Sequence, residues 1–162
     1  PGKLSDKRLA ALQAIEPATT HNSKRAQYEG YGAEVGNEAT QTETFVWTWL
    51  KSNDPRWQGV DFTLATGKAL NEKRSYIRIQ YKDGSEDVFE ELPITNPEDG
   101  RLDAYERVLI DAINDKDDIF ITSEEVVRSW EILDELQSVW ALDNEAFAKY
   151  PKGASIEQII NS

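Results

Sequence analysis

Cysteine and methionine are both absent from this sequence of 162 residues, and histidine occurs once, as His21. The absence of cysteine excludes a disulfide framework, a thiolate nucleophile and a zinc–thiolate site. The one histidine lies in a Thr-Thr-His-Asn-Ser stretch of linker-like composition, so we expect neither a histidine-based triad nor a histidine-based metal site. We therefore predict no catalytic residue and no metal ligand in this chain.

Long hydrophobic runs are also missing. No apolar stretch approaches the roughly 20 residues that cross a bilayer, and the N-terminus lacks the charged, apolar and small-residue regions of a secretory signal. A chain without cysteine suits a reducing compartment, and we expect a cytoplasmic location. Because the chain begins at Pro1 and contains no methionine, we expect it to be a piece of a longer protein.

Positive charge is scarce and unevenly distributed. The formal net charge is -12, yet residues 1–82 carry 12 basic and 9 acidic side chains, whereas residues 83–162 carry 6 and 21. An acidic field disfavours nucleic acid, whose binding depends on Lys and Arg neutralising phosphates, and it disfavours anionic membranes. We expect neither as a partner, and we expect any anionic ligand to bind the first half.

The composition predicts a folded domain. Hydrophobic residues make up 39% of the chain, with five Trp, which is enough to build a core. We expect a single domain over residues 1–162. Its expected parts are an N-terminal helix and connection over 1–42, a sheet over 43–95 and a helical half over 102–162.

Alternation of apolar and polar residues predicts several strands. Between Thr44 and Leu50, Phe45, Trp47 and Trp49 share one face. A Lys-Asp-Gly-Ser turn predicts that the last two strands form a hairpin. The expected strands cover residues 44–50, 60–64, 75–82 and 87–92, with a short strand near Ala26-Gln27-Tyr28 in an otherwise extended connection over 18–41.

Helical spacing and capping signals predict the remaining elements. The expected helix starts are Ser5, with an end near Glu16, the capping box of Asp103 and Glu106, and the capping box of Thr122 and Glu125; a short last helix covers 156–160. Strands followed by helices, without regular alternation, favour an α+β fold. We expect a mainly antiparallel sheet of about four or more strands, covered by helices.

A cluster of cations follows one expected strand. The strand expected over residues 60–64 leads into Gly67-Lys68, and Lys73 and Arg74 come shortly after. Desolvated cations need a partner, so cations gathered at a strand end indicate an anion site. The spacing also allows a polar turn whose basic side chains are merely solvated.

Several segments together resemble the C-terminal part of glucose-6-phosphate dehydrogenase. They occur in the order of that family and cover nearly the whole chain. They are Arg25-Ala26-Gln27-Tyr28, Glu43-Thr44-Phe45, Trp57-Gln58-Gly59-Val60 with Phe62, Thr66-Gly67-Lys68-Ala69-Leu70, Asp103-Ala104-Tyr105-Glu106-Arg107, Ser123-Glu124-Glu125-Val126 with Trp130, and Tyr150-Pro151-Lys152-Gly153.

The resemblance implies a function and roles for the cation cluster. The family oxidises glucose 6-phosphate to 6-phosphogluconolactone with NADP, in the pentose phosphate pathway. By similarity, Lys68 and Lys73 contact the bound sugar phosphate, Gly67 lets the backbone turn at the strand end, and Arg74 contacts a second, non-catalytic NADP. The implied partners are glucose 6-phosphate, a separate N-terminal nucleotide-binding domain and a second copy of the chain in a homodimer.

The chain also departs from the family pattern. It has no Gly-x-Gly-x-x-Gly turn after a strand and no counterpart of the family's catalytic His-Tyr-Leu-Gly-Lys motif. NADP is therefore expected to bind mainly to the missing N-terminal domain, and the chain alone is expected to be inactive. The connection over residues 83–102 is shorter than in the family, and Ala65 stands where the family commonly has arginine.

Other interpretations remain open. A non-catalytic self-association or interaction module derived from the same fold would also account for the short connection and for Ala65. A carbohydrate-binding module would use Trp47, Trp49 and Trp57 to stack on sugars, although aromatic stripes on strands usually belong to the core. The acidic stretch from Asp111 to Asp118 lacks the spacing of a calcium-binding loop and is expected to be a solvated helix end.

Overall fold

The computed structural model describes residues 3–90, 104–114, 116, 120–143 and 148–161. The chain divides into two compact units. The first comprises Pro1–Glu72 and Ile121–Ser162, and the second comprises Lys73–Phe120. The expectation of one domain over 1–162, with its three parts, stays a prediction. Among the described residues, no helix is both long and apolar enough to cross a membrane.

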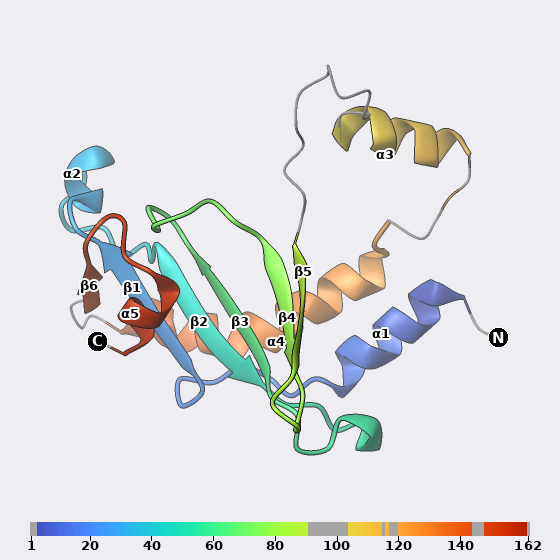
Figure 1. Cartoon of the computed structure of the whole chain (residues 1–162). Coiled ribbons are helices and arrows are strands. Elements are labelled where there is room, and N and C mark those ends of the chain that lie inside the picture. The colour runs from blue at the N-terminus through green and yellow to red at the C-terminus, as the bar shows by residue number, and fades with distance from the viewer. Residues whose placement is uncertain (1–2, 91–103, 115, 117–119, 144–147, 162) are drawn as a thin grey trace. The chain divides into compact units, whose positions relative to one another are not determined.

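The first unit is built on a four-stranded sheet in the order β3-β2-β1-β6 (Figure 1). The strands are β1 (Ser23–Tyr28), β2 (Phe45–Leu50), β3 (Phe62–Gly67) and β6 (Ala148–Tyr150). β2 pairs antiparallel with β1 and β3, whereas β6 pairs parallel with β1. The expected α+β fold with a mainly antiparallel sheet is confirmed.

Two strands of this sheet differ from expectation. β1 is a full strand of six residues rather than a short one, because Ser23–Ala26 pair with β2 and both Ala26 and Tyr28 belong to an apolar cluster. β6 has only three residues, and such a segment is too short to show a strand period. Its existence therefore depends on pairing with β1.

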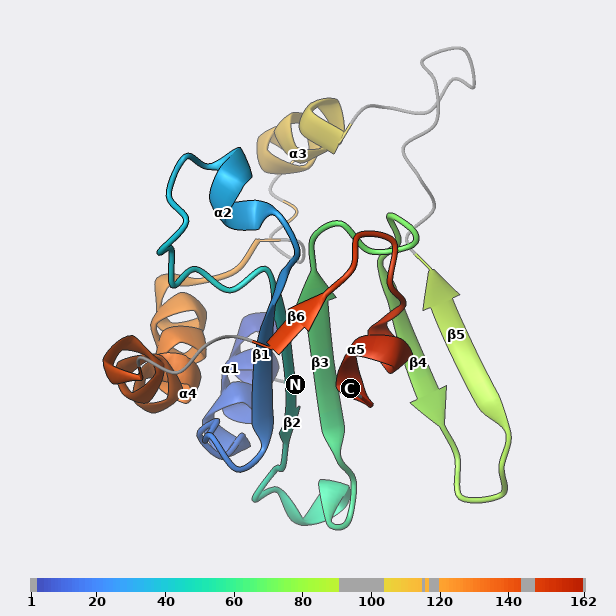
Figure 2. The ribbon, with the colours of Figure 1, turned by 90° about the vertical axis from the view of Figure 1, so that its left-hand side faces the viewer.

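The alternation along β2 directs side chains to both faces of the sheet. Phe45 and Trp47 belong to a cluster that includes Ile159 of helix α5 (Ile156–Ile160). Leu50 belongs to a second cluster, which contains residues of helices α1 (Leu4–Ala14) and α4 (Ser123–Leu142). Helices therefore cover both faces, with α5 on one and α1 and α4 on the other (Figure 2).

The predicted capping box of Thr122 and Glu125 is confirmed at the start of α4, whereas the predicted start of α1 at Ser5 is wrong. The Glu125 N–H donates to Thr122 Oγ1 at 3.2 Å, and the Thr122 N–H donates to Glu125 Oε2 at 2.7 Å. Ser5 is not a cap: it lies inside α1, whose N-cap is Lys3, and the Lys3 N–H donates to the Asp6 carboxylate at 3.2 Å. The Asp6 carboxylate, rather than the Ser5 hydroxyl, therefore accepts a backbone hydrogen bond at the start of this helix.

Short elements complete the first unit. α2 (Tyr31–Glu34) follows β1, and a 3₁₀ helix (Pro55–Trp57) lies between β2 and β3.

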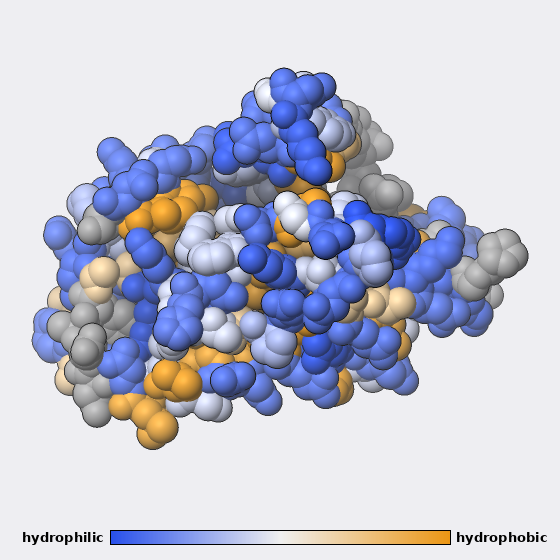
Figure 3. Space-filling view, turned by 90° about the horizontal axis from the view of Figure 1, so that it is seen from below, coloured by the Kyte–Doolittle hydropathy of each residue, from blue (hydrophilic) through white to orange (hydrophobic). Residues whose placement is uncertain are grey.

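Figure 3 shows a face of the molecule on which hydrophobic residues form separate groups among hydrophilic ones.

The second unit contains the hairpin of β4 (Tyr76–Gln80) and β5 (Glu86–Glu90) and the helix α3 (Ala104–Ile113). The hairpin confirms the predicted turn: the Tyr81 N–H donates to the Ser85 carbonyl at 2.9 Å, and Gly84 has φ of 88°. These two strands form a sheet of their own. The predicted cap at Asp103 lies outside the described residues.

Helices α1 and α4 are joined by a charged contact. Arg8 donates from Nε to Glu125 Oε1 at 2.6 Å and from Nη2 to Oε2 at 3.2 Å. The Glu125 side chain is only 3% exposed. Its hydrogen bonds from Arg8, followed by those from Thr122, lower the pKa of Glu125 to about 2. The carboxylate is therefore charged throughout the physiological range, which suits a bidentate pair with arginine.

The lowered pKa makes this contact sensitive to acid. A carboxyl group with a lowered folded pKa stabilises the fold above its ordinary pKa and loses that contribution as the pH falls toward the folded value. We expect Glu125→Gln to reduce the free energy of unfolding at neutral pH, with the difference from wild type shrinking between about pH 4.5 and about pH 2. Urea unfolding followed by tryptophan fluorescence measures this difference.

Glu124→Gln is the matched control, because Glu124 is the exposed neighbour on the same helix. It is expected to show little change at any pH. A wild-type advantage over Glu125→Gln that stayed constant down to pH 2 would contradict the assignment.

Candidate functional site

The backbone of Lys68 is fixed on both sides where β3 ends. Its N–H donates to the Thr44 carbonyl at 2.8 Å, and its carbonyl accepts from the Tyr150 hydroxyl at 2.8 Å. The Lys68 side chain is exposed. The backbone of Lys68 is thus held by hydrogen bonds, while its side chain reaches into solvent.

The turn after Lys68 contains a strained residue. Ala69 has φ of 52°, in the left-handed region that disfavours residues with a Cβ by about 1–2 kcal/mol. Its carbonyl accepts from the Gly153 N–H at 2.7 Å, and the Asn71 N–H donates to the Ala154 carbonyl at 3.1 Å. The segment from Tyr150 to Ala154 therefore holds the turn in place.

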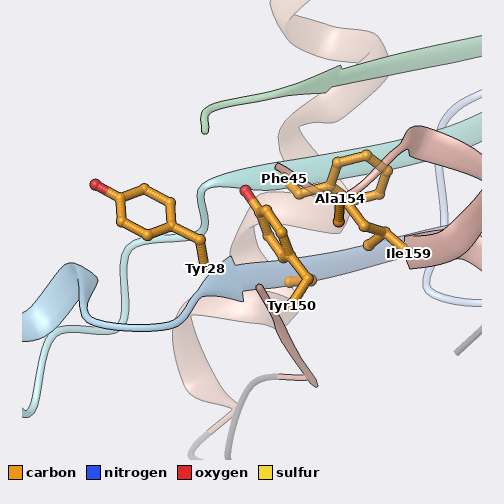
Figure 4. Packing of buried hydrophobic residues seen from close by; sticks show 6 residues of the cluster. Tyr28, Phe45, Tyr150, Ala154 and Ile159 are labelled. Carbon is orange, nitrogen blue, oxygen red and sulfur yellow. The ribbon is translucent and has the colours of Figure 1, made fainter. Parts of the chain in front are cut away.

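Tyr150 connects this segment to the core. The residue is 2% exposed, and desolvation raises the pKa of its hydroxyl. Its proton is shared between the carbonyls of Lys68, at 2.8 Å, and Thr44, at 3.0 Å. Its ring lies edge-on to those of Phe45 and Tyr28, at 6.0 and 6.3 Å between centroids, in the cluster that Figure 4 shows.

Gly67 is required by space rather than by backbone conformation. Its φ does not lie in the left-handed region, so the expectation that it supplies the turn is wrong. A Cβ at this position would lie 2.8 Å from Phe45 Cδ2 and 3.3 Å from Leu70 Cδ2. The close approach of the strand end to the phenyl ring excludes a side chain, while Ala69 takes the left-handed conformation.

Lys68 differs from neighbouring cations in its partners. Lys152 contacts the Glu34 carboxylate and lies 5.1 Å from the Tyr28 ring centroid. Hydrogen bonds from Lys152 and then from Tyr28 lower the pKa of Glu34. Lys68, in contrast, makes no ion pair among the residues that the structure describes. Its charge is available for an external anion.

The two other predicted site residues belong to the second unit. Lys73 is its first residue and is exposed. The Arg74 guanidinium contacts the Glu90 carboxylate and lies 4.5 Å from the Tyr76 ring centroid. Because Lys68 and Lys73 lie in different units, the convergence of their ammonium groups on one ligand stays a prediction.

A hollow of about 580 Å³ lies at the opposite end of β3 from Lys68. Trp57 lines it and is 44% exposed, with its ring edge-on to Phe62 at 5.5 Å between centroids. Trp47 instead packs against the core cluster around Phe45. Trp49 lies beside Trp47, at 6.3 Å between ring centroids. Trp57 alone of these three tryptophans lines the hollow, which is separate from the cation turn.

The described residues do not contain the Gly-rich fingerprint of a dinucleotide-binding turn. Gly30-Tyr31-Gly32 follows β1, but Val35 occupies the third glycine position of the dinucleotide motif, and α2 has only four residues. No group of three acidic or histidine residues suited to a metal ion occurs in the described part of the chain. Asp115, Asp117 and Asp118 of the predicted helix end lie outside it.

Four of the quoted motifs meet at the cation turn. In the sheet, Gly67 pairs with Phe45, Phe45 with Ala26, and Ala26 with Ala148, just before Tyr150. The motifs around these residues are far apart in the sequence but lie on neighbouring strands. The sequence showed the order of these motifs. It did not show that they lie close together, because their proximity depends on strand pairing.

The family of this chain follows from a direct match. A family model described as glucose-6-phosphate dehydrogenase, C-terminal domain, matches residues 1–102 and 94–158. The chain belongs to this family of dehydrogenase C-terminal domains.

Curated relatives agree with this assignment. The chain is 29% identical over 175 residues to glucose-6-phosphate 1-dehydrogenase 5, cytoplasmic, of Arabidopsis thaliana, covering 82% of this chain and 34% of that protein. It is 28% identical over 202 residues to glucose-6-phosphate 1-dehydrogenase of Dickeya dadantii (strain 3937), covering 90% and 41%. The chain thus spans between about a third and two fifths of the length of these relatives.

Solved structures share the fold. Glucose-6-phosphate dehydrogenase in complex with its substrate glucose-6-phosphate matches 96% of this chain and 43% of its own, with a TM-score of 0.69 and 20% identity. Glucose-6-phosphate 1-dehydrogenase from Mycobacterium avium matches 93% and 40%, with a TM-score of 0.65 and 21% identity.

The packing around Gly67 gives a stability prediction. Gly67→Ala places a methyl group against the Phe45 ring, and we expect it to lower the free energy of unfolding by about 1–3 kcal/mol. Thr66→Ala, at the exposed neighbouring position, is expected to cost less than about 1 kcal/mol. Chemical denaturation of the three proteins makes the comparison. Equal stability of Gly67→Ala and wild type would show that the ring gives way without cost.

Proposed function

We propose that this chain is the substrate-binding and oligomerisation domain of a glucose-6-phosphate dehydrogenase, and that Lys68 contacts the phosphate of glucose 6-phosphate. The observation that supports the proposal is the turn itself. It presents an ammonium group from a backbone bonded on both sides, where four family-like motifs meet. That ammonium group has no carboxylate partner among the described residues.

The chemistry of the ligand matches this arrangement. A phosphomonoester carries about two negative charges near neutral pH. A lysine ammonium group is a compact charge with three donors, which suits phosphate oxygens or sugar hydroxyls. Because the chain has a net charge of -12, its overall field repels such a ligand. Binding must therefore depend on local contacts.

Lys73 and Arg74 have distinct parts in the proposal. Lys73 is exposed and would add a second contact to the sugar phosphate. Arg74 would contact a second, non-catalytic NADP, for which it must exchange the Glu90 carboxylate for a phosphate group. An exchange of one anionic partner for another keeps its charge compensated.

The complete reaction requires groups that this sequence does not contain. NADP, when bound, accepts the hydride from glucose 6-phosphate; the turn between β1 and α2 lacks the Gly-rich fingerprint that binds a catalytic dinucleotide. We assign NADP to a separate nucleotide-binding domain, and we expect this chain alone to be inactive. A homodimer and a cytoplasmic location belong to the same proposal.

Removing the Lys68 charge tests the proposal. We expect Lys68→Ala to weaken glucose 6-phosphate binding about tenfold or more, since a hydrogen bond to a charged group contributes about 1.5–3 kcal/mol. Isothermal titration calorimetry of the chain measures the affinity, with glucose and inorganic phosphate as comparison ligands. Glucose alone is expected to bind far more weakly because it lacks the charged group.

Lys51→Ala is the matched control. Lys51 is an exposed lysine that lines the hollow at the opposite end of β3. Its loss removes the same charge and should leave the affinity unchanged. Equal losses for both variants would indicate a non-specific charge effect. No heat from the wild-type chain would exclude autonomous substrate binding.

A further inference from the structure

We infer that Tyr150 is a positioning residue that sets the direction of the Lys68 side chain through the backbone of the turn. This inference rests on the proposed function of Lys68. Tyr150 lies 82 positions along the chain from Lys68, and its hydroxyl reaches the Lys68 carbonyl at 2.8 Å. The proposed phosphate contact therefore depends on the C-terminal part of this chain, although none of the residues proposed to contact the ligand lies there.

The position of β3 explains why the turn needs this support. Among the residues that the structure describes, β3 is the last strand of its sheet and pairs with β2 alone. The ladder continues one residue past the strand, where the Lys68 N–H donates to the Thr44 carbonyl. Beyond that bond, the described strands make no further hydrogen bond to the turn. The other described hydrogen bonds to its backbone come from residues 150–154.

The Tyr150 hydroxyl joins the two chain segments that meet at Lys68. It donates to the carbonyls of Lys68 and Thr44, and it lies 2.9 Å from Thr44 Oγ1. Thr44 Oγ1 in turn accepts from the Tyr28 N–H at 2.8 Å. One buried hydroxyl group thus connects the turn, β2 and β1, and no phenylalanine at this position would make these bonds.

The conformation of Ala69 shows that the turn is held against its own preference. A left-handed alanine persists only where the surroundings determine the backbone. The Gly153 N–H supplies one such bond, to the Ala69 carbonyl at 2.7 Å, and Leu70 forms a bridge with Ala154. If the turn relaxed, the peptide after Lys68 would rotate and the ψ angle of Lys68 would change, and with it the rotamers open to the Lys68 side chain.

Tyr150→Phe tests this role by removing one oxygen from a buried ring. The Lys68 carbonyl then loses a buried partner, and we expect glucose 6-phosphate affinity to fall by up to about tenfold, the loss expected for Lys68→Ala, because Tyr150 acts through that side chain. The loss should not add to that of Lys68→Ala in the double variant, because Tyr150 acts through Lys68. Calorimetry of the four proteins measures the coupling.

A second measurement reports the turn without any ligand. In Tyr150→Phe we expect faster hydrogen exchange of the Lys68, Asn71 and Gly153 amides, together with a shifted NMR signal of the Lys68 side-chain ε-methylene group. The Trp49 amide, which donates to the Asn22 carbonyl at the far end of β2, should keep its exchange rate. A general loss of stability would change all four amides alike.

Tyr28→Phe is the matched control. Tyr28 is a buried tyrosine of the same cluster, but its hydroxyl donates to Glu34 at 2.6 Å and not to the turn. It should leave the affinity and the Lys68 signals unchanged. Unchanged exchange and affinity in Tyr150→Phe, or fully additive losses with Lys68→Ala, would overturn the inference. If the wild-type chain binds no glucose 6-phosphate, autonomous substrate binding is excluded, and the exchange rates still decide whether Tyr150 holds the turn.

Discussion

The pairing of β6 with β1 brings the Tyr150 hydroxyl between the ends of β2 and β3. A strand of three residues contributes little by itself, but it carries a tyrosine whose ring fills the core and whose hydroxyl satisfies two backbone carbonyls. Residues 151–154 then run along the turn after β3 and bond to it. The position of Lys68 is therefore a consequence of closing the sheet with a C-terminal strand.

Charge separates structural cations from the candidate site. Arg8 is committed to Glu125, Arg74 contacts Glu90, and Lys152 contacts Glu34. Arg25 and Arg56 also form ion pairs, whereas Lys51 and Lys73, like Lys68, form none with the residues that the structure describes. Lys68 makes no ion pair among the described residues, and the exposed end of β3 gives it access to solvent. A cation in this state is suited to an anionic ligand that arrives from outside.

Local sequence signals predicted much of the fold. The alternation in residues 44–50, the Lys-Asp-Gly-Ser hairpin turn and the capping box of Thr122 each depend on a few neighbouring residues, and each is confirmed. The predicted start of α1 at Ser5 was wrong. Ser5 is a good cap by residue type, but the N-cap is Lys3, two residues earlier, and its N–H donates to the Asp6 carboxylate. β6 left no signal because three residues are too few to show a period.

The sequence by itself determined the α+β pattern, the uneven charge, the absence of thiol chemistry and the order of motifs that marks the family. These properties follow from composition and from spacing within short segments. Only the tertiary structure decided that Gly67 makes room for the Phe45 ring, that Ala69 adopts the left-handed conformation, and that Tyr150 bonds to Lys68. The physical reason is that such contacts arise from strand register and packing between segments distant in the chain, which local patterns do not specify.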